Sequence, residues 1–161
     1  MVTTIVQWPS LALKQVSAAV GAGGLDGALR GLIDEMHSVL EESGGCGLSA
    51  IQIGVPARVV VTTFPDMPVL INPIISTSGF KLPVQEGCLS LPGFFETVWR
   101  HQHVSVQFSD ADGQPKGLEV TGLQAQCLQH EVEHLNGEFF LKHVSSARRD
   151  AIRAKLRKGQ R

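Results

Sequence analysis

Apolar residues first recur at a helical spacing between positions 25 and 40. They fall on one face of a helix that the pair Gly44-Gly45 would end: Leu25, Leu29, Leu32, Ile33, Met36, Val39 and Leu40. The next two apolar segments, 58–64 (RVVVTTF) and 69–75 (VLINPII), are rich in β-branched residues and predict strands. The first half of the chain thus predicts one amphipathic helix followed by strands.

The second half of the chain continues with strands and ends with helices. Segment 104–108 alternates, and Asp112-Gly113 predicts a turn into a strand at 118–120. Residues 123–135 favour a helix that Gly137 ends, and a last helix is expected to begin near Ser145. No repeat or low-complexity linker divides the chain. We therefore expect a single α+β domain, in which short antiparallel strands surround the helix at 123–135 and further helices lie toward the two ends.

Composition narrows the class of protein. The chain has 161 residues, of which 43% are hydrophobic and 18% charged, as in one folded domain. No apolar run reaches the roughly 18 residues of a membrane span, and the first 25 residues lack the features of a signal peptide. We expect a soluble cytoplasmic protein with no membrane partner. Three cysteines are too few for a disulfide scaffold but suit a metal or catalytic site.

Charge is divided unevenly along the chain. Residues 147–161 carry seven basic residues and one acid, a net charge of +6, whereas residues 1–146 carry −7. We interpret 1–146 as the catalytic body and 147–161 as a basic C-terminal helix or tail. Such a tail is typical of contact with nucleic acid or an anionic surface. It is equally typical of a solvated helix end whose cations oppose the helix dipole.

The motif His130-Glu131-Val132-Glu133-His134 carries the clearest chemistry. Residues at i and i+4 lie about 40° apart around a helix and about 6 Å apart along it, so both imidazoles can converge on one metal ion. Glu131 between them is placed to move protons on a bound water. A catalytic site of this kind needs a third protein ligand.

Two cysteines compete for the place of third ligand. Cys127 shares the helix face of His130, but its position lies about 7–8 Å from the midpoint of the two histidines and its thiol leans away from them. It is better interpreted as a small apolar residue on the buried face. Cys88, in Glu86-Gly87-Cys88-Leu89-Ser90, stands beside a glycine on an extended segment that can approach a metal held elsewhere.

The third candidate segment, residues 45–52 (GCGLSAIQ), lies between a predicted helix and a predicted strand. Its glycines permit close approach of a ligand, and Gln52 can donate a hydrogen bond into a site. Glycine-rich loops of this kind more often only turn the chain.

The three segments together, in the order GCGLSAIQ, EGCLS and QHEVEHLNG, resemble the three signature motifs of the peptide deformylase family. Those motifs are Gly-x-Gly-Leu-Ala-Ala-x-Gln, Glu-Gly-Cys-Leu-Ser and Gln-His-Glu-x-Asp-His-Leu-x-Gly. The resemblance extends over residues 5–144 and includes Ile71-Asn72-Pro73 and Arg100. It implies a metal-dependent hydrolase that removes the N-formyl group from the initiator methionine of new polypeptides and releases formate.

The same resemblance assigns roles to individual residues. It implies that Cys88, His130 and His134 bind the metal, usually Fe(II), with zinc, nickel or cobalt able to replace it. Glu131 would be the general base and then the acid. Gln52 and the backbone N–H of Leu89 would stabilise the oxyanion, and the backbone of Gly45 would align the peptide. The donor types by themselves point to zinc.

The methionine side chain needs an apolar pocket, for which the metal helix offers Leu123, Cys127 and Leu128. These three residues can also simply be core. We further expect Trp99 and Phe94-Phe95 to lie next to the substrate, where their bulk would affect peptide preference.

Two residues depart from the family motifs. Ser49 stands where the family usually has alanine, and Glu133 stands where it usually has aspartate. Glu131 and Glu133 flank the histidine pair at nearly equal angles, so geometry alone does not name the base, and the motif assigns Glu131. For Glu133 we expect an ion pair with Arg100 that supports the metal site.

Other readings of the chain remain open at this stage. A protease or amidase with the same two-histidine helix would take its third ligand from downstream, where His143 and Glu138 are poorly placed. A deformylase-like paralogue with altered substrate or lost activity would bind ribosomes or nascent chains. Whether the chain is an active deformylase or such a paralogue, residues 147–161 are expected to contact ribosomal RNA. Absence of a transit peptide favours the bacterial cytoplasm, and a processed organelle protein would have the same sequence features.

Overall fold

The computed structural model describes residues 4–21 and 26–159, in which helices precede and follow a group of strands. The α-helices are α1 (Gly27–Ser43), α2 (Gly122–Leu135) and α3 (Ser146–Gly159). Short 3-10 helices are η1 (Leu11–Lys14), η2 (Ala50–Ile53) and η3 (Phe140–His143). The strands are β1 (Gly47–Ser49), β2 (Val59–Thr62), β3 (Val69–Cys88), β4 (Leu91–Ser109) and β5 (Pro115–Thr121). The predicted α+β class is confirmed.

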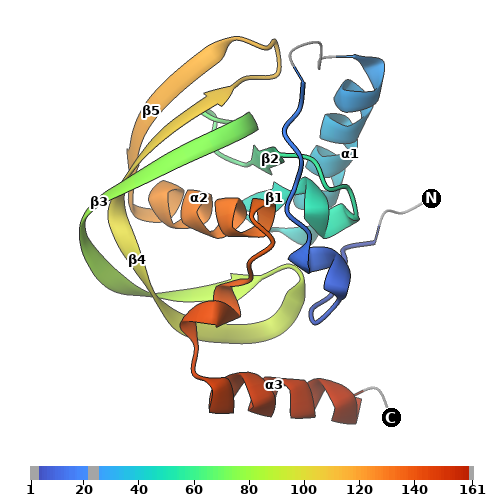
Figure 1. Cartoon of the computed structure of the whole chain (residues 1–161), viewed down its shortest axis with the longest axis vertical. Helices are drawn as coiled ribbons and strands as arrows, with labels where there is room; N and C mark the ends of the chain where they lie inside the picture. The colour runs from blue at the N-terminus through green and yellow to red at the C-terminus, as the bar shows by residue number, and fades with distance from the viewer. Residues whose placement is uncertain (1–3, 22–25, 160–161) are drawn as a thin grey trace.

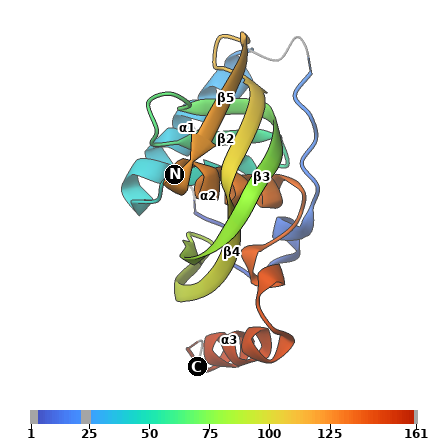
Figure 2. The ribbon, with the colours of Figure 1, turned by 90° about the vertical axis from the view of Figure 1, so that its left-hand side faces the viewer.

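All five strands join in one antiparallel sheet with the order β1-β2-β3-β4-β5. Figure 1 shows α2 inside the curve that the long strands β3 and β4 describe, and Figure 2 shows β3, β4 and β5 side by side. A core cluster that includes Val104, Val106, Leu128 and Leu135 packs α2 against this sheet. The helix that carries the metal-site motif is therefore held at the centre of the fold.

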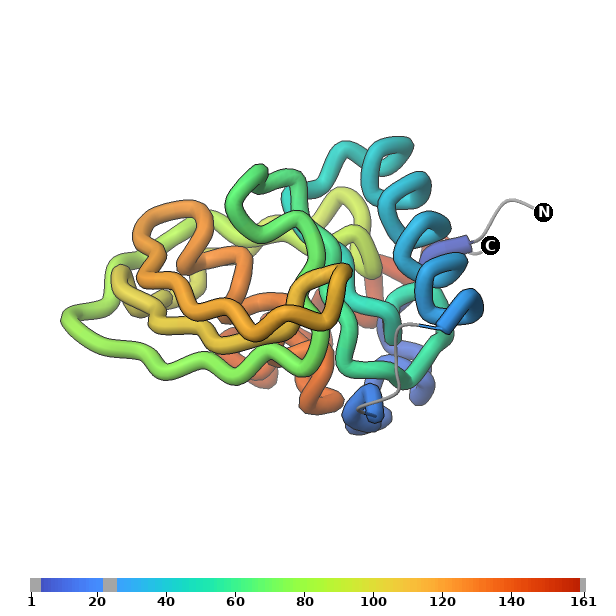
Figure 3. The backbone as a smooth tube through the Cα atoms, turned by 90° about the horizontal axis from the view of Figure 1, so that it is seen from above, coloured from blue at the N-terminus to red at the C-terminus, as the bar shows by residue number. Residues whose placement is uncertain are grey.

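Helix α1 covers a different part of the sheet. It packs on β1 and β2, with which it shares a core cluster, and Figure 3 shows it at one side of the molecule. Asp26 caps its first turn by accepting a hydrogen bond from the Leu29 N–H at 2.9 Å, and Gly44 ends it with φ of 71°. The predicted stop is thus confirmed, whereas the predicted first residue, Leu25, lies outside the described residues.

The prediction of short strands is wrong for β3 and β4, which have 20 and 19 residues. The segments 69–75 and 104–108 are only the parts of these strands that the apolar pattern of the sequence reveals. Between Ser76 and Pro83 every side chain of β3 is exposed, so burial no longer alternates there. Register shifts near Gly79 bend the ribbon further. Backbone pairing continues through this stretch without the apolar pattern that reveals a half-buried strand.

Helix α3 begins at the predicted boundary and packs on the body of the protein. Its Ile152 is fully buried in a cluster with Phe140 and Leu141. Arg148 forms an ion pair with Glu96 at 2.7 Å, and the Arg153 guanidinium lies 5.2 Å from the ring centre of Trp8. Arg161 of the predicted tail lies outside the described residues. None of the described helices combines the length and apolar character that a membrane span requires.

Candidate metal centre

Helix α2 brings the central motif into the interior. Strand β5 ends at Thr121, and the helix begins directly at Gly122, so the motif stands in its last turns. The side chains of His130, Glu131 and His134 are all buried. Buried polar side chains in this number need partners or a ligand, because each loses its contact with water.

Cys88 joins the two histidines from the end of strand β3. Its Sγ lies 3.3 Å from Nε2 of His134, which in turn lies 3.1 Å from Nε2 of His130. The three ligand atoms all lie within 4.8 Å of one another. The three residues expected as ligands are thus brought together, although Cys88 is more than 40 residues away from the histidines in sequence.

These residues fit a bound metal ion. Three atoms with lone pairs crowd together, an arrangement that a cation among them stabilises, and one thiolate with two imidazoles is a common donor set for a first-row transition metal. Nδ1 of His134 is buried without a hydrogen-bond partner among the described residues, so the polar contacts of this ring all lie on its Nε2 side. Three protein ligands leave a fourth position for water and substrate, as in catalytic sites.

Cys127 lies on α2, apart from the three candidate ligands. It is buried, faces the side chain of Cys46, and does not belong to the ligand group found among the described residues. The hydrogen bond with Cys46, burial and the charge of Glu131 together raise the pKa of the Cys127 thiol well above its ordinary value. The interpretation of Cys127 as a neutral residue of the buried helix face agrees with this placement.

A carboxylate orients the first histidine. Oε1 of Glu86 lies 2.6 Å from Nδ1 of His130, which fixes Nδ1 as the protonated nitrogen and leaves Nε2 for the metal. Burial alone would raise the pKa of Glu86, but hydrogen bonds from Arg100 and His130 outweigh it and lower this pKa to about 2. Sequence reasoning missed Glu86. Its position two residues before Cys88 on one strand, hence on the same face, was the available signal.

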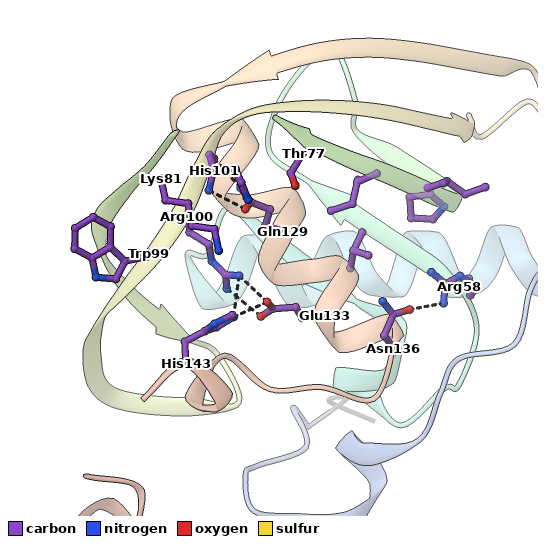
Figure 4. A pocket seen from close by; sticks show the side chains of 14 residues that line it. Arg58, Thr77, Lys81, Trp99, Arg100, His101, Gln129, Glu133, Asn136 and His143 are labelled. Atoms are coloured by element: carbon purple, nitrogen blue, oxygen red, sulfur yellow. Dashed lines mark hydrogen bonds and ion pairs between the residues drawn. The ribbon is translucent and has the colours of Figure 1, made fainter. Parts of the chain in front are cut away.

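Arg100 connects Glu86 with Glu133, as expected for the Glu133 departure. Its Nε donates to Glu86 at 2.9 Å, and its Nη1 donates to Glu133 at 2.7 Å. His143, from η3, adds a contact to Glu133 at 2.6 Å (Figure 4). Burial alone would lower the pKa of Arg100, but the two carboxylates raise it above its already high ordinary value, so the guanidinium stays charged.

Glu133 and Arg100 border a second cavity of about 400 Å³ on the outer side of α2 (Figure 4). Trp99 lines this cavity and not the one beside the metal ligands. The expectation that Trp99 lies next to the substrate is therefore wrong. Consecutive strand residues face opposite ways, and Trp99 is the exposed neighbour of the buried Val98 and Arg100.

The cavity beside the candidate ligands has a volume of about 530 Å³ and is lined by Cys88 and His130. Its lining is mainly apolar, and among it are the following predicted site residues: Gly45, Gln52, Cys88, Leu89, Leu123, Cys127, His130 and Glu131. Phe94 and Phe95 also line it, as expected for residues near a substrate. The cavity is large enough for a methionine side chain with adjoining peptide.

Leu128 does not line this cavity. It is fully buried in the core cluster between α2 and the sheet, with Val60, Val104 and Val106. The next residue along a helix is turned by about 100°, so Leu128 points away from the side that Cys127 presents to the cavity. Its assignment to the substrate pocket is corrected to a core position.

Gln52 is held at the site by its amide group. Its Oε1 accepts a hydrogen bond from the backbone N–H of Ser49 at 2.9 Å, which fixes the orientation of the amide. Its Nε2 then lies 3.2 Å from Ser90 Oγ and 3.6 Å from Cys88 Sγ. A donor next to a metal ligand is where a developing negative charge would need it.

Glu131 is buried next to the cavity with its carboxylate held by a hydroxyl. Burial raises the pKa of Glu131, while the charge of His130 and the hydrogen bond from Ser49 oppose the rise. The net effect is a raised pKa, which suits a group that first accepts and later donates a proton near neutral pH.

The fold and the site together define a class, α+β proteins with a buried candidate site for one metal ion, formed by two histidines and one cysteine. Residues 2–150 match the family model described as "Polypeptide deformylase". A peptide deformylase from Azotobacter vinelandii is 40% identical, with 99% of this chain and 97% of that protein covered. The chain belongs to the peptide deformylase family.

Solved structures agree with this assignment. The crystal structure of peptide deformylase from Ehrlichia chaffeensis is 36% identical and superposes with a TM-score of 0.92, covering 100% of this chain and 98% of that one. The same enzyme in complex with actinonin gives a TM-score of 0.92 at 37% identity, covering 99% of this chain and 98% of that one.

Proposed function

We propose that this chain hydrolyses the N-formyl group of the initiator methionine on newly made polypeptides and releases formate. The observation that carries the proposal is the position of Glu131 and the cluster of Cys88, His130 and His134 beside one apolar cavity. Family membership supplies the reaction, and the cavity supplies room for a methionyl substrate.

Cys88, His130 and His134 would hold a divalent metal ion, which when bound supplies a Lewis acid for the formyl carbonyl and lowers the pKa of water. Glu131 takes the proton of the attacking water, because it is a buried carboxylate with a raised pKa. The same residue then protonates the amine that leaves. Gln52 Nε2 and the backbone N–H of Leu89 stabilise the oxyanion from the side of Cys88.

Gly45 and the cavity wall hold the substrate. A side chain at Gly45 would meet Leu89 Cδ1 at 2.9 Å, so glycine keeps this edge open for the backbone of a peptide. Leu123 stands exposed at the rim and Cys127 lies buried in the wall. These residues leave an apolar space of the kind that an unbranched methionine side chain fills.

For the metal we infer Fe(II), with zinc, nickel or cobalt able to occupy the same ligands. Protein purified without oxygen should contain about one iron per chain. Activity that is lost in air and restored by nickel or cobalt would support iron as the native ion. Full, air-stable activity with zinc alone would contradict it.

We further propose that α3 carries the enzyme to the ribosome in the bacterial cytoplasm. Arg148, Arg149 and Arg153 contact the body of the protein, whereas Lys155, Arg157 and Lys158 are exposed at the far end of the helix. Cations at that end are available to phosphate groups.

The docking proposal is tested without deleting α3, because deletion would uncover Phe140 and Leu141. A variant with Lys155, Arg157 and Lys158 changed to Gln should lose co-sedimentation with ribosomes at low salt and keep its activity on short peptides. Lys14→Gln, on η1, is the charge control. Unchanged co-sedimentation of the triple variant would overturn the proposal.

Substrate selectivity tests the proposed reaction. The metal-loaded enzyme should release formate from formyl-Met-Ala-Ser and should not cleave peptide bonds in the unformylated tripeptide. Cleavage of the unformylated peptide would instead indicate a protease. Bound metal with no reaction on either peptide would indicate a paralogue that has lost the activity.

A further inference from the structure

Ser49 approaches the catalytic carboxylate from strand β1. Its Oγ donates to Oε2 of Glu131 at 2.7 Å and lies 3.0 Å from the backbone carbonyl oxygen of the same residue. Both residues are buried, and Ser49 is fully so. Among the described residues, Ser49 is the only side chain that hydrogen-bonds this carboxylate. The contact joins two segments that are 82 residues apart.

Two residues on one face of strand β1 lie next to the side chain of Glu131. Gly47 and Ser49 stand at i and i+2, so both are directed toward α2. A Cβ at Gly47 would lie 3.0 Å from Oε1 of Glu131 and 2.7 Å from Cys127 Sγ, so the absence of a side chain there makes room for the carboxylate. Ser49 then fixes the other oxygen, Oε2. One carboxylate oxygen is thus bonded, and Oε1 remains without a side-chain donor among the described residues.

We propose that Ser49 is a positioning residue for this reaction, which selects the Glu131 rotamer that presents Oε1 to the attacking water. The inference rests on the proposed deformylase function. A glutamate side chain has three rotatable bonds, so a buried carboxylate with no fixed partner samples several orientations, and only some of them reach the water. The hydrogen bond from Ser49 removes this freedom before substrate arrives.

The hydroxyl suits this role because it has a second acceptor within reach. When the Glu131 carboxylate turns away during the reaction, the same hydroxyl proton can rotate to the Glu131 carbonyl oxygen at 3.0 Å. The buried donor therefore stays satisfied in both arrangements, and release of the carboxylate does not leave an unpaired hydroxyl.

Ser49 also links the base to the oxyanion donor. Its backbone N–H orients Gln52, while its side chain orients Glu131. The backbone contact is open to any residue, but the side-chain contact requires a hydroxyl. The alanine that stands at this position in the family motif would keep the first contact and lose the second. The side-chain contact thus depends on the serine that this chain has at position 49, and with it the arrangement of Glu131.

The test compares Ser49→Ala with wild type in the nickel-loaded enzyme, using formyl-Met-Ala-Ser. We expect kcat to fall about tenfold, with KM within about twofold and with unchanged metal content and unfolding midpoint, because misorientation of a reacting group costs rate rather than binding. Ser49→Thr, which keeps the hydroxyl, should recover part of kcat. Ser17→Ala is the matched control, since Ser17 is a buried serine whose Oγ has no partner in the described chain.

The outcomes separate this inference from the proposed function. A wild-type enzyme that releases no formate contradicts the function itself. An active wild type with Ser49→Ala equally active overturns the positioning role of Ser49. A Ser49→Ala variant whose activity falls only in proportion to lost metal or lost folded protein also overturns it, because the serine would then be merely structural.

Discussion

Arg100 and Glu133 form a two-pronged ion pair, with Nη1 at 2.7 Å from Oε1 and Nη2 at 3.0 Å from Oε2. Arg100 also holds Glu86, and Glu86 holds Nδ1 of His130. A chain of charge-assisted hydrogen bonds therefore runs from the outer side of α2 to a candidate metal ligand. Glutamate at position 133 is one methylene longer than the aspartate of the family motif, and these hydrogen bonds accommodate it. The ion pair between Glu133 and Arg100 expected from the sequence is confirmed.

Replacing Arg100 by Gln should lower the free energy of unfolding by about 3–5 kcal/mol, because the buried Glu86 and the partly buried Glu133 would lose their shared counter-charge. Urea unfolding at pH 7 measures the change. Arg148→Gln is the control, since this exposed ion pair with Glu96 should contribute little. Equal unfolding midpoints for the two variants would contradict the importance assigned to Arg100.

Glu86→Gln should weaken metal binding by about 10–100-fold, because the amide orients His130 without the charge of a carboxylate. Competition with a chromophoric chelator measures the affinity for zinc. Glu96→Gln, on the paired position of the neighbouring strand, is a suitable control. If Glu86→Gln binds zinc as tightly as wild type, Glu86 does not support the ligand.

Stability should fall in acid because of Glu86. Its pKa in the folded protein is about 2, below the ordinary value of about 4.3, so the folded state favours the ionised form. The resulting stabilisation is fully present above the unfolded-state pKa and is lost as the pH falls from about 4.5 toward 2. Urea unfolding of chelator-treated protein should show this loss, and the profile of Glu86→Gln should be flatter. Parallel profiles would refute the assignment.

Gly47→Ala should reduce activity by more than its loss of folded protein explains. The added methyl group would meet Cys127 Sγ at 2.7 Å and Glu131 at 3.0 Å, so both side chains must move. Overpacking of this kind costs about 1–3 kcal/mol in stability. Formate release per folded, metal-loaded molecule should fall at least tenfold. Gly31→Ala, on the open face of α1, is the control because nothing lies within 4 Å of its added Cβ.

The sequence predicted those features of the site that depend on residue spacing within one helix or on a family motif. His130 and His134 share a helix face because of their spacing, and α1 ends at Gly44 as its glycine signal indicates. Cys88 and Gln52 were expected from the family motifs, and the fold brings both to the histidines.

The parts that sequence reasoning missed depend on how distant segments meet. Ser49 reaches Glu131 across 82 residues, and His143 reaches Glu133 from a short helix whose direction no periodicity reveals. The error over Leu128 has the same origin, since an apolar residue on α2 can face either the cavity or the sheet. Trp99 was misplaced because the sequence does not reveal which face of β4 meets the cavity; burial alternates there, and Trp99 lies on the exposed face.

The most direct test of the account is formate release from formyl-Met-Ala-Ser by anaerobically purified, Fe(II)-loaded protein, with Glu131→Ala beside it. The account predicts kcat/KM of at least about 10⁴ M⁻¹s⁻¹, in the ordinary enzyme range. It also predicts that Glu131→Ala keeps one metal per chain and loses at least about a thousandfold in kcat. A metal-loaded wild type that releases no formate, or a Glu131→Ala variant with activity near that of wild type, would contradict the account.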